Sequence, residues 1–220
     1  MTSSVPVIAI DGPSASGKGT VAQRLAEHLG FHCLDSGALY RLVALSALRK
    51  GIPWSDQHSL GELARSLPVR FERGQIFLEK ELVTDEIRSE RCSEGASIVA
   101  AIGAVREGLT ERQKAFRQAP GLVAEGRDMG SVIFPDAVLK IFLTASAEIR
   151  AERRLKQLKQ KGITARLPVL LQDLRERDAR DSSRSVAPLK PTLDAHRLDT
   201  TELSVLQAVE QILLWYQGNR

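Results

Sequence analysis

The sequence feature that most constrains the fold is a glycine-rich run at residues 12–20, which directly follows the largely apolar run Val5-Pro6-Val7-Ile8-Ala9-Ile10-Asp11. This order predicts a buried strand that leads into a tight turn, and the turn opens a helix. Backbone N–H groups of such a turn and of the helix N-terminus can converge on an anionic phosphate, and Lys18 can reach the outer phosphates of a nucleotide. The predicted phosphate-binding loop consists of Gly12, Pro13, Ser14, Ala15, Ser16, Gly17, Lys18, Gly19 and Thr20.

This loop departs from the common pattern at one position. Gly19 stands where a Ser or Thr usually follows the lysine, and the hydroxyl comes one residue later, at Thr20. Thr20 is therefore our candidate ligand on the Mg²⁺ side of a bound nucleotide, either directly or through water. The alternative interpretation of the run is a glycine-rich turn with an exposed lysine, but the strand before it and the helix after it favour nucleotide binding.

Strand and helix patterns alternate along most of the chain. We expect strands at 7–11, 32–34, 122–125, 138–143 and 197–199, and helices at about 17–29, 38–50, 146–161, from about 168, and after residues 204–207. Repeated βα units imply a parallel sheet with helices on both faces. Ligands bind beyond the C-terminal strand ends of such sheets. The loops expected there are Gly12–Thr20, Asp35–Gly37, Gly126–Asp128 and Thr144–Ser146.

The alternation breaks in the middle of the chain. Short strands are expected at 69–71, 76–78 and 82–84, with a turn at Arg73-Gly74, and a helical pattern resumes over about 93–118. We interpret this stretch as an inserted β-rich subdomain. Farther along, the polar segment 156–166 lies between two expected helices and resembles a mobile lid.

Composition narrows the class of ligand. A chain of 220 residues with 43% hydrophobic residues is expected to form one domain, with a modest insertion at most. The net charge is +4 and Lys and Arg are spread along the chain, which favours small anionic substrates over nucleic acid. Cys33 and Cys92 form no metal-ligand or disulfide pattern. We see no signal peptide and no run of transmembrane length, so we expect a cytoplasmic protein.

Polar residues at two expected strand ends suggest a second anion site. Ser36 is expected to cap the second helix, and Arg41 lies about one turn farther on, so the two can hold a second phosphate. Arg127 and Asp128 follow another strand. They either satisfy loop backbone, or Arg127 contacts a phosphate and Asp128 accepts hydrogen bonds from a base or sugar.

A third group of charged residues has helical spacing. Arg177, Arg180, Asp181 and Arg184 fall on one face, as a solvated surface or as a phosphate-binding face. Arg150, Arg153 and Arg154 make a weaker case on the preceding helix. Several arginines around one cleft fit phosphoryl transfer, because they stabilise charge on the transferred group. No His or carboxylate is clearly placed as a general base, and an acceptor that is already a phosphate dianion needs none.

Taken together, these features resemble those of the bacterial cytidylate (CMP) kinases, a family of nucleoside monophosphate kinases. The resemblance covers nearly the whole chain. It rests on the motifs IDGPSASGKGT, LDSGALYR, VREGLTERQKAFR, EGRDMGSVIFPDA and RERDARDSSRSVAPL. The Gly19-Thr20 order is itself typical of monophosphate kinases. The family often has Asp where this chain has Glu125.

The resemblance implies a fold and a set of site residues. It implies a three-layer α/β P-loop fold with a five-stranded parallel sheet: a core at about 1–62 and 103–220, an NMP-binding insertion at about 63–102 and a lid at about 154–168. It implies ATP at residues 12–20 with Mg²⁺, and catalysis by Lys18, Arg127 and Arg184. The CMP-binding positions would be Ser36, Arg41, Ser97, Arg106, Arg127, Asp128, Arg177, Asp181 and Arg184.

By similarity, Ser97, Arg106 and Asp128 would read the cytosine, whereas Arg41, Arg127 and Arg184 would hold the α-phosphate. Arg177 and Asp181 would lie near the sugar hydroxyls. The expected reaction is ATP-dependent phosphorylation of CMP and dCMP by a monomer, with no nucleic-acid or membrane partner. Two alternatives stay open: a kinase for UMP, AMP or a small hydroxyl acceptor, and a nucleotide-dependent RNA-binding module. Aromatic residues make up only 5% of the chain, which disfavours the RNA-binding module.

Overall fold

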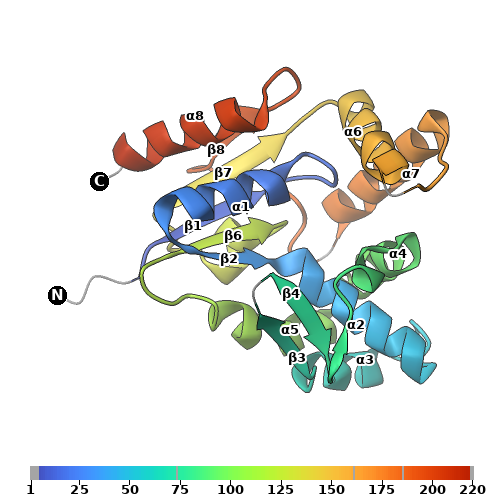
Figure 1. Cartoon of the computed structure of the whole chain (residues 1–220). Helices are drawn as coiled ribbons and strands as arrows, with labels where there is room; N and C mark the ends of the chain where they lie inside the picture. The colour runs from blue at the N-terminus through green and yellow to red at the C-terminus, as the bar shows by residue number, and fades with distance from the viewer. Residues whose placement is uncertain (1–4, 73, 161, 185, 219–220) are drawn as a thin grey trace. The chain divides into compact units, whose positions relative to one another are not determined.

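The computed structural model describes residues 5–72, 74–160, 162–184 and 186–218. The expected turn residue Arg73 and the expected helix end Lys161 lie outside these residues. The chain divides into two compact units, the first made of residues 1–34 and 116–220 and the second of residues 35–115. Figure 1 shows the elements of both.

The first unit is built on a five-stranded sheet with the strand order β2-β6-β1-β7-β8. Its strands are β1 (Val7–Asp11), β2 (His32–Asp35), β6 (Leu122–Gly126), β7 (Leu139–Thr144) and β8 (His196–Asp199). β1 pairs in parallel with β6 on one side and β7 on the other, and β7 pairs in parallel with β8. The predicted five-stranded parallel sheet is confirmed.

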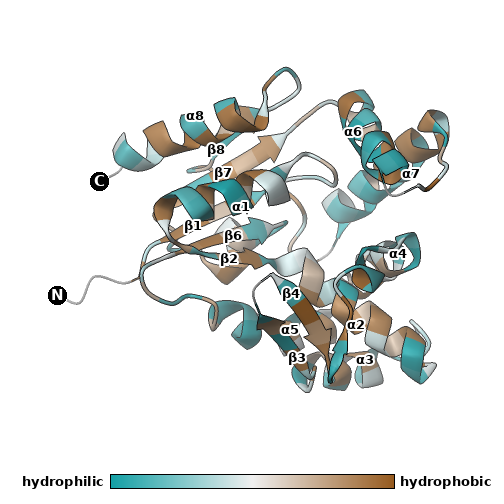
Figure 2. Ribbon diagram, viewed as in Figure 1, coloured by the Kyte–Doolittle hydropathy of each residue, from teal (hydrophilic) through white to brown (hydrophobic). Residues whose placement is uncertain are grey.

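Central strand β1 is fully buried because both of its faces are covered. Ile8 and Ile10 lie in a hydrophobic core with residues of α1 (Lys18–Leu29) and α8 (Val205–Gly218). On the opposite face, the short π-helix η2 (Met129–Ile133) packs against β1. Teal and brown alternate along α1 and α8 in Figure 2, as expected for helices that bury one face.

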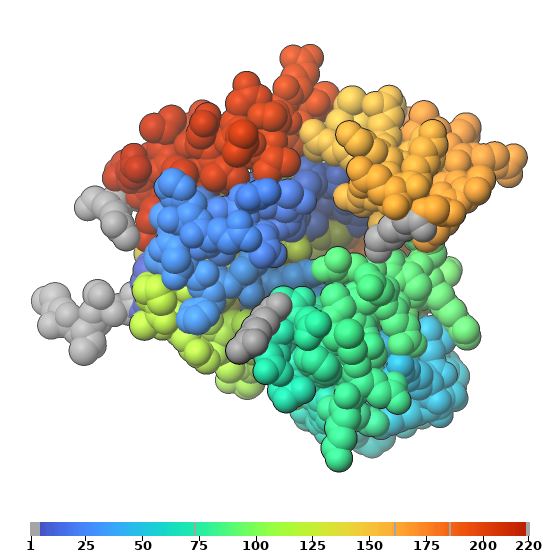
Figure 3. All heavy atoms as spheres, viewed as in Figure 1, coloured from blue at the N-terminus to red at the C-terminus, as the bar shows by residue number. Residues whose placement is uncertain are grey.

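Two further helices complete the first unit. α6 (Ala147–Gln160) and α7 (Leu167–Ser183) pack against each other around a small cluster that includes Leu158, Leu170 and Leu174. They project from the rest of this unit, in yellow and orange in Figure 3. Pro168 lies in the first turn of α7, as the sequence predicted.

The second unit combines helices with a small sheet. Its helices are α2 (Ser36–Lys50), α3 (Gln57–Arg65), the 3₁₀ turn η1 (Glu86–Arg88), α4 (Glu90–Val99) and α5 (Gly103–Lys114). Strands β3 (Val69–Glu72), β4 (Gln75–Leu78) and β5 (Glu81–Leu82) form an antiparallel sheet. α2 packs on α3 and α4, and α3 packs on α5. The insertion expected at 63–102 lies within this unit, and its functional boundaries remain a prediction.

Three local expectations differ from the structure. The helical pattern over 93–118 is two helices, α4 and α5, because the chain bends at Ala100–Ile102. α3 and η2 had no counterpart in the sequence prediction. The cap of α2 is Asp35 and not Ser36, since the Asp35 Oδ1 accepts a hydrogen bond from the Ala38 N–H at 3.0 Å.

Candidate active site

The predicted phosphate loop connects β1 to α1 in the first unit, and its shape depends on glycine. Gly12 has a φ of 157°, and a Cβ at this position would lie 2.0 Å from the Leu143 carbonyl oxygen. Gly17 adopts the left-handed region directly before α1. Within the described residues no side chain caps α1, so its first N–H groups can serve a bound anion.

Lys18 is buried within this loop. Its ammonium Nζ donates a hydrogen bond to the Pro13 carbonyl at 3.2 Å and lies 3.7 Å from a Glu125 carboxylate oxygen. Both side chains are about nine-tenths buried, and burying such charges is tolerated because they are paired. The Lys18 ammonium therefore lies between the phosphate loop and the end of β6. A nucleotide phosphate can compete with Pro13 and Glu125 for this ammonium group.

Arginines of α6 hold the loop through its backbone carbonyls. Arg153 Nη1 donates to the Ser16 carbonyl at 3.1 Å, and its Nη2 donates to the Thr200 carbonyl at 2.5 Å. The Thr200 hydroxyl also donates to the Ser16 carbonyl, at 3.2 Å. Arg150 donates from Nη1 to the Ser14 carbonyl at 3.1 Å. The sequence suggested a phosphate-binding face on this helix. In the structure, the side chains of Arg150 and Arg153 donate hydrogen bonds to protein oxygens.

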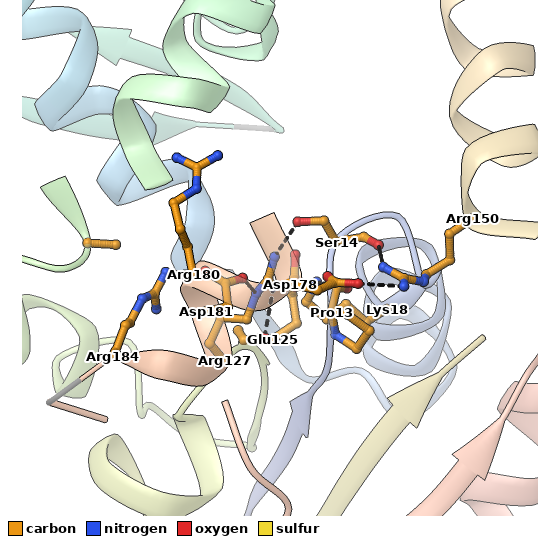
Figure 4. A network of polar contacts seen from close by, with 12 residues as sticks. Pro13, Ser14, Lys18, Glu125, Arg127, Arg150, Asp178, Arg180, Asp181 and Arg184 are labelled. Carbon is orange, nitrogen blue, oxygen red and sulfur yellow. Dashed lines mark hydrogen bonds and ion pairs between the residues drawn. The ribbon is translucent and has the colours of Figure 1, made fainter. Parts of the chain in front are cut away.

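The strongest cluster of charge surrounds Asp181 on α7 (Figure 4). Arg127 Nε donates to Asp181 Oδ2 at 2.7 Å, and Arg184 forms an ion pair with the other carboxylate oxygen. Burial raises the pKa of Asp181, but Arg127, Arg184 and Arg177 outweigh it and hold this pKa below its usual value. The carboxylate thus stays ionised and orients the arginines.

Arg127 also contacts the phosphate loop directly. Its Nη2 donates to the Ser14 hydroxyl at 2.8 Å, and its Nη1 donates to the Gly126 carbonyl at 3.1 Å. Arg180, which shares the predicted helix face, is exposed and points away from this network in Figure 4. The predicted face therefore brings Arg184 and Asp181 together with Arg127, whereas Arg180 lies apart.

Asp128 is buried at the start of η2, with 3% of its surface exposed. The turn that carries it is fixed by Asp11, whose two carboxylate oxygens each accept a hydrogen bond at 2.8 Å, from the Met129 and Gly130 N–H groups. Burial raises the pKa of Asp11 to about 6, despite these two bonds, and the nearby Asp128 charge also raises it. Asp11 was not singled out from the sequence, because its role depends on a loop more than a hundred residues away.

In the second unit, two predicted acceptor residues lie at the start of α2. Arg41 Nη2 donates to Asp35 Oδ2 at 2.7 Å, and its buried Nε has no hydrogen-bond partner in the part of the chain that the structure describes. Ser36 is buried in the first turn of the helix. Asp35 thus both caps α2 and orients Arg41.

The other two predicted residues of this unit are Ser97 on α4 and Arg106 on α5, and both are buried. Arg106 Nη1 donates to the Ala100 carbonyl at 3.3 Å. The Ser97 hydroxyl has no hydrogen-bond partner among the described residues, so a buried donor and acceptor remain available. Spacing alone could not identify this pair, and only the resemblance pointed to it.

The residues present fit Mg²⁺ only together with nucleotide phosphates. Thr20 is exposed on the first turn of α1, where its hydroxyl can bind a cation or its water. No cluster of three or more His, Cys, Asp or Glu that could hold a metal occurs among the described residues. Mg²⁺ usually keeps several waters and relies on one or two protein ligands plus substrate phosphates, so this donor set suits it.

The geometry of the first unit can stabilise a densely negative ligand. The site contains a phosphate loop shaped by glycines, the buried Lys18, and two arginines that Asp181 orients. The loop follows β1, and Arg127 follows β6. Such groups stabilise the charge of a transferring phosphoryl group without donating or accepting a proton.

No described helix is long and apolar enough to span a membrane.

A family model and several curated proteins are similar to this chain over nearly its whole length. The model of a family described as cytidylate kinase matches residues 8–217. A protein named cytidylate kinase from Burkholderia ambifaria (strain MC40-6) is 60% identical over 213 residues, which cover 97% of this chain and 93% of the relative. A namesake from Burkholderia pseudomallei (strain 1106a) is 59% identical over 212 residues, with 96% and 93% coverage.

A solved structure shares the fold at much lower identity. A gluconokinase from Sinorhizobium meliloti 1021 superposes with a TM-score of 0.50 and 16% identity, over 97% of this chain and 93% of the other. At this identity the likeness concerns the architecture alone, and it agrees with the three-layer α/β arrangement around the parallel sheet.

Proposed function

This chain belongs to the cytidylate kinase family, and from that premise we propose that it transfers the γ-phosphoryl group of ATP to CMP or dCMP, which yields ADP and CDP or dCDP. The observation that carries the proposal is the hydrogen bond from Arg127 to Ser14. It joins the phosphate loop to an arginine pair held by Asp181, so a second anionic group can be received beside the donor phosphates.

The reaction needs positioning and charge more than proton transfer. An oxygen of the acceptor α-phosphate attacks the γ-phosphorus in line, a new P–O bond forms, and the bond to the β-phosphate oxygen breaks. We propose that the loop of residues 12–20 holds the ATP phosphates and that Lys18 stabilises the transferring group. Mg²⁺, when bound with ATP near Thr20, supplies further positive charge.

We propose that the acceptor phosphate is held by Arg127, Arg184 and Arg41. Arg127 and Arg184 are preset by Asp181, which lowers the entropy lost when they bind a phosphate. Arg41, oriented by Asp35, is the third candidate for this phosphate, together with Ser36, which lies five residues earlier in the first turn of α2. Arg177 and Asp181 are assigned to the sugar hydroxyls.

Cytosine recognition is assigned to Ser97, Arg106 and Asp128. A buried hydroxyl, guanidinium and carboxylate match the amino group, ring nitrogen and carbonyl of this pyrimidine. Buried polar groups that lose their partner are costly, so a site of this kind rejects a base with the wrong donors and acceptors. We further propose that residues 63–102 form the NMP-binding insertion and residues 154–168 the lid. The enzyme is proposed to be monomeric and cytoplasmic.

A coupled assay of ADP formation tests the proposed function. With ATP and Mg²⁺ present, CMP and dCMP should each stimulate ADP release, whereas AMP should not. Equal stimulation by AMP, or ADP release that no monophosphate increases, would overturn the assignment. Salt-dependent RNA binding in a protein without CMP-stimulated turnover would point instead to an RNA-binding module.

A further inference from the structure

Ser14, in the phosphate loop, is contacted by two arginines at once. Its side-chain hydroxyl accepts a hydrogen bond from Arg127 at 2.8 Å, and its backbone carbonyl accepts one from Arg150 at 3.1 Å. Ser14 has only 6% of its surface exposed. The two arginines come from different elements: Arg127 follows β6 and Arg150 lies on α6.

Both arginines are also held by the same helix. Arg150 Nη2 donates to Asp178 Oδ2 at 2.5 Å, and Arg127 Nε donates to Asp181 Oδ2 at 2.7 Å. Asp178 and Asp181 both belong to α7 and are three residues apart, so they lie on one side of it. The contacts form a closed ring that runs from Ser14 through Arg150 to α7 and returns through Arg127 (Figure 4).

The ring consists of charge-assisted hydrogen bonds made by side chains that are buried or largely buried. The side chains of Arg150 and Asp181 are 6% and 1% exposed, and those of Arg127 and Asp178 are 17% and 25% exposed. Charge-assisted hydrogen bonds of this kind are shorter and stronger than neutral ones. These contacts connect Asp178 of α7 through Arg150 to the Ser14 backbone, and the Ser14 hydroxyl to Arg127.

We propose that Ser14 is a positioning residue, which acts through Arg127 and is itself held in place by the Arg150–Asp178 pair. This inference rests on the proposed function, because it takes Arg127 as the receiver of the acceptor phosphate. The hydroxyl and carbonyl of one loop residue thus keep the donor loop and the acceptor arginine in register. The Ser14 hydroxyl need not contact either nucleotide, because the phosphate loop holds ATP through its backbone N–H groups.

The first test is Ser14→Ala, which deletes the acceptor for Arg127 but keeps the backbone carbonyl that Arg150 binds. We expect KM for CMP to rise about tenfold, since one hydrogen bond to a charged group is lost, whereas KM for ATP changes less than twofold. A loop residue that merely stabilises the fold would not produce this split. Equal effects on both substrates, or no effect on either, would overturn the proposal.

The second test is Asp178→Ala, on the partly exposed part of the ring, and it serves even if the Ser14 variant does not fold. Asp178 is assigned to neither the ATP-binding nor the CMP-binding residues. In Asp178→Ala we nevertheless expect KM for CMP to rise about threefold and KM for ATP to keep its wild-type value. In the Ser14→Ala background the same change should add no further effect, because the ring is already open. Multiplying effects in the double variant would contradict the coupling.

The matched control is Glu148→Ala. Glu148 of α6 pairs with Arg175 of α7 at 3.0 Å, so it joins the same two helices, but both side chains are exposed and neither contacts the loop in any described bond. This variant should keep wild-type KM values, and the same rise as in Asp178→Ala would overturn the proposal. Failure of the proposed function is distinguishable, because the wild-type protein would then show no CMP-stimulated ADP release at all.

Discussion

At the scale of single residues, the buried charges of the first unit are held by specific partners. Lys18, Asp11 and Asp181 are each less than a tenth exposed, and each has a partner of opposite charge or a pair of backbone donors. Burying an isolated charge would cost several kcal/mol. These residues are therefore preset in one arrangement before any ligand arrives, which is a requirement for electrostatic catalysis.

Lys18→Ala should abolish most activity without unfolding the protein. The loss of one preset charge at the transferring phosphoryl group should lower kcat by about 10²- to 10³-fold. Steady-state ADP release measures the rate, and far-UV circular dichroism checks the fold. A variant that folds normally and keeps the wild-type kcat would remove the phosphate loop from the mechanism.

Asp128→Ala should weaken recognition of the acceptor selectively. We expect KM for CMP to increase about tenfold or more and KM for ATP to stay within twofold, since the carboxylate is assigned to the base of the acceptor. Initial rates with each substrate varied in turn provide the measurement. Asp128→Asn is the matched control for shape, and parallel increases for both substrates would argue against base recognition.

The site was predictable from sequence to the extent that its residues follow a periodic or loop pattern. Arg127 and Asp128 directly follow a strand, and Arg184 shares a helical spacing with Asp181, so all four could be named. Ser97 and Arg106 lie on two different helices joined by a bend, and no repeat relates them. The hydrogen bonds of Asp11 and Ser14 likewise depend on tertiary contacts.

At the scale of elements, α3 shows why part of the second unit escaped prediction. It is nine residues long and contains Gly61, which disfavours a helix in isolation. The glycine is explained by packing on α5, since a Cβ at Gly61 would lie 2.8 Å from the Ala104 Cβ. Helix formation here is set by a close approach to a neighbour, which sequence periodicity does not report.

Gly108→Ala should destabilise this helix pair. A Cβ at position 108 would lie 2.9 Å from the Ala64 Cβ and 3.0 Å from two backbone atoms of α3, so the helices would have to separate. Overpacking of this kind costs about 1–3 kcal/mol. Urea denaturation measures the free energy of unfolding. Gly103→Ala, at the partly exposed start of α5 with no atom within 4 Å of the added Cβ, is the control, and equal stability of both variants would contradict the packing argument.

At the scale of the whole molecule, stability should depend on pH through Asp11. Its pKa is raised from about 3.8 to about 6 in the folded protein. Between these values the folded state holds a proton that the unfolded state has lost, so the free energy of unfolding falls as the pH rises through this window. The shift corresponds to roughly 3 kcal/mol.

Comparison of the wild-type protein with Asp11→Asn isolates this contribution. Relative to the variant, the wild type should lose stability from about pH 4 to about pH 6 and stay level above it. Urea denaturation at several pH values gives both curves. A difference between the two proteins that does not vary with pH would show that Asp11 titrates with its ordinary pKa.

The position of β1 in the sheet has a consequence for biosynthesis. This strand leaves the ribosome before its two neighbours, which begin only at Leu122 and Leu139. At a synthesis rate of about 5–20 residues per second, its backbone N–H and C=O groups stay without their partner strands for several seconds or more. Nascent chains that end before β7 should therefore associate with chaperones or aggregate, and the strand that presents the phosphate loop becomes fixed only after β7 has been made.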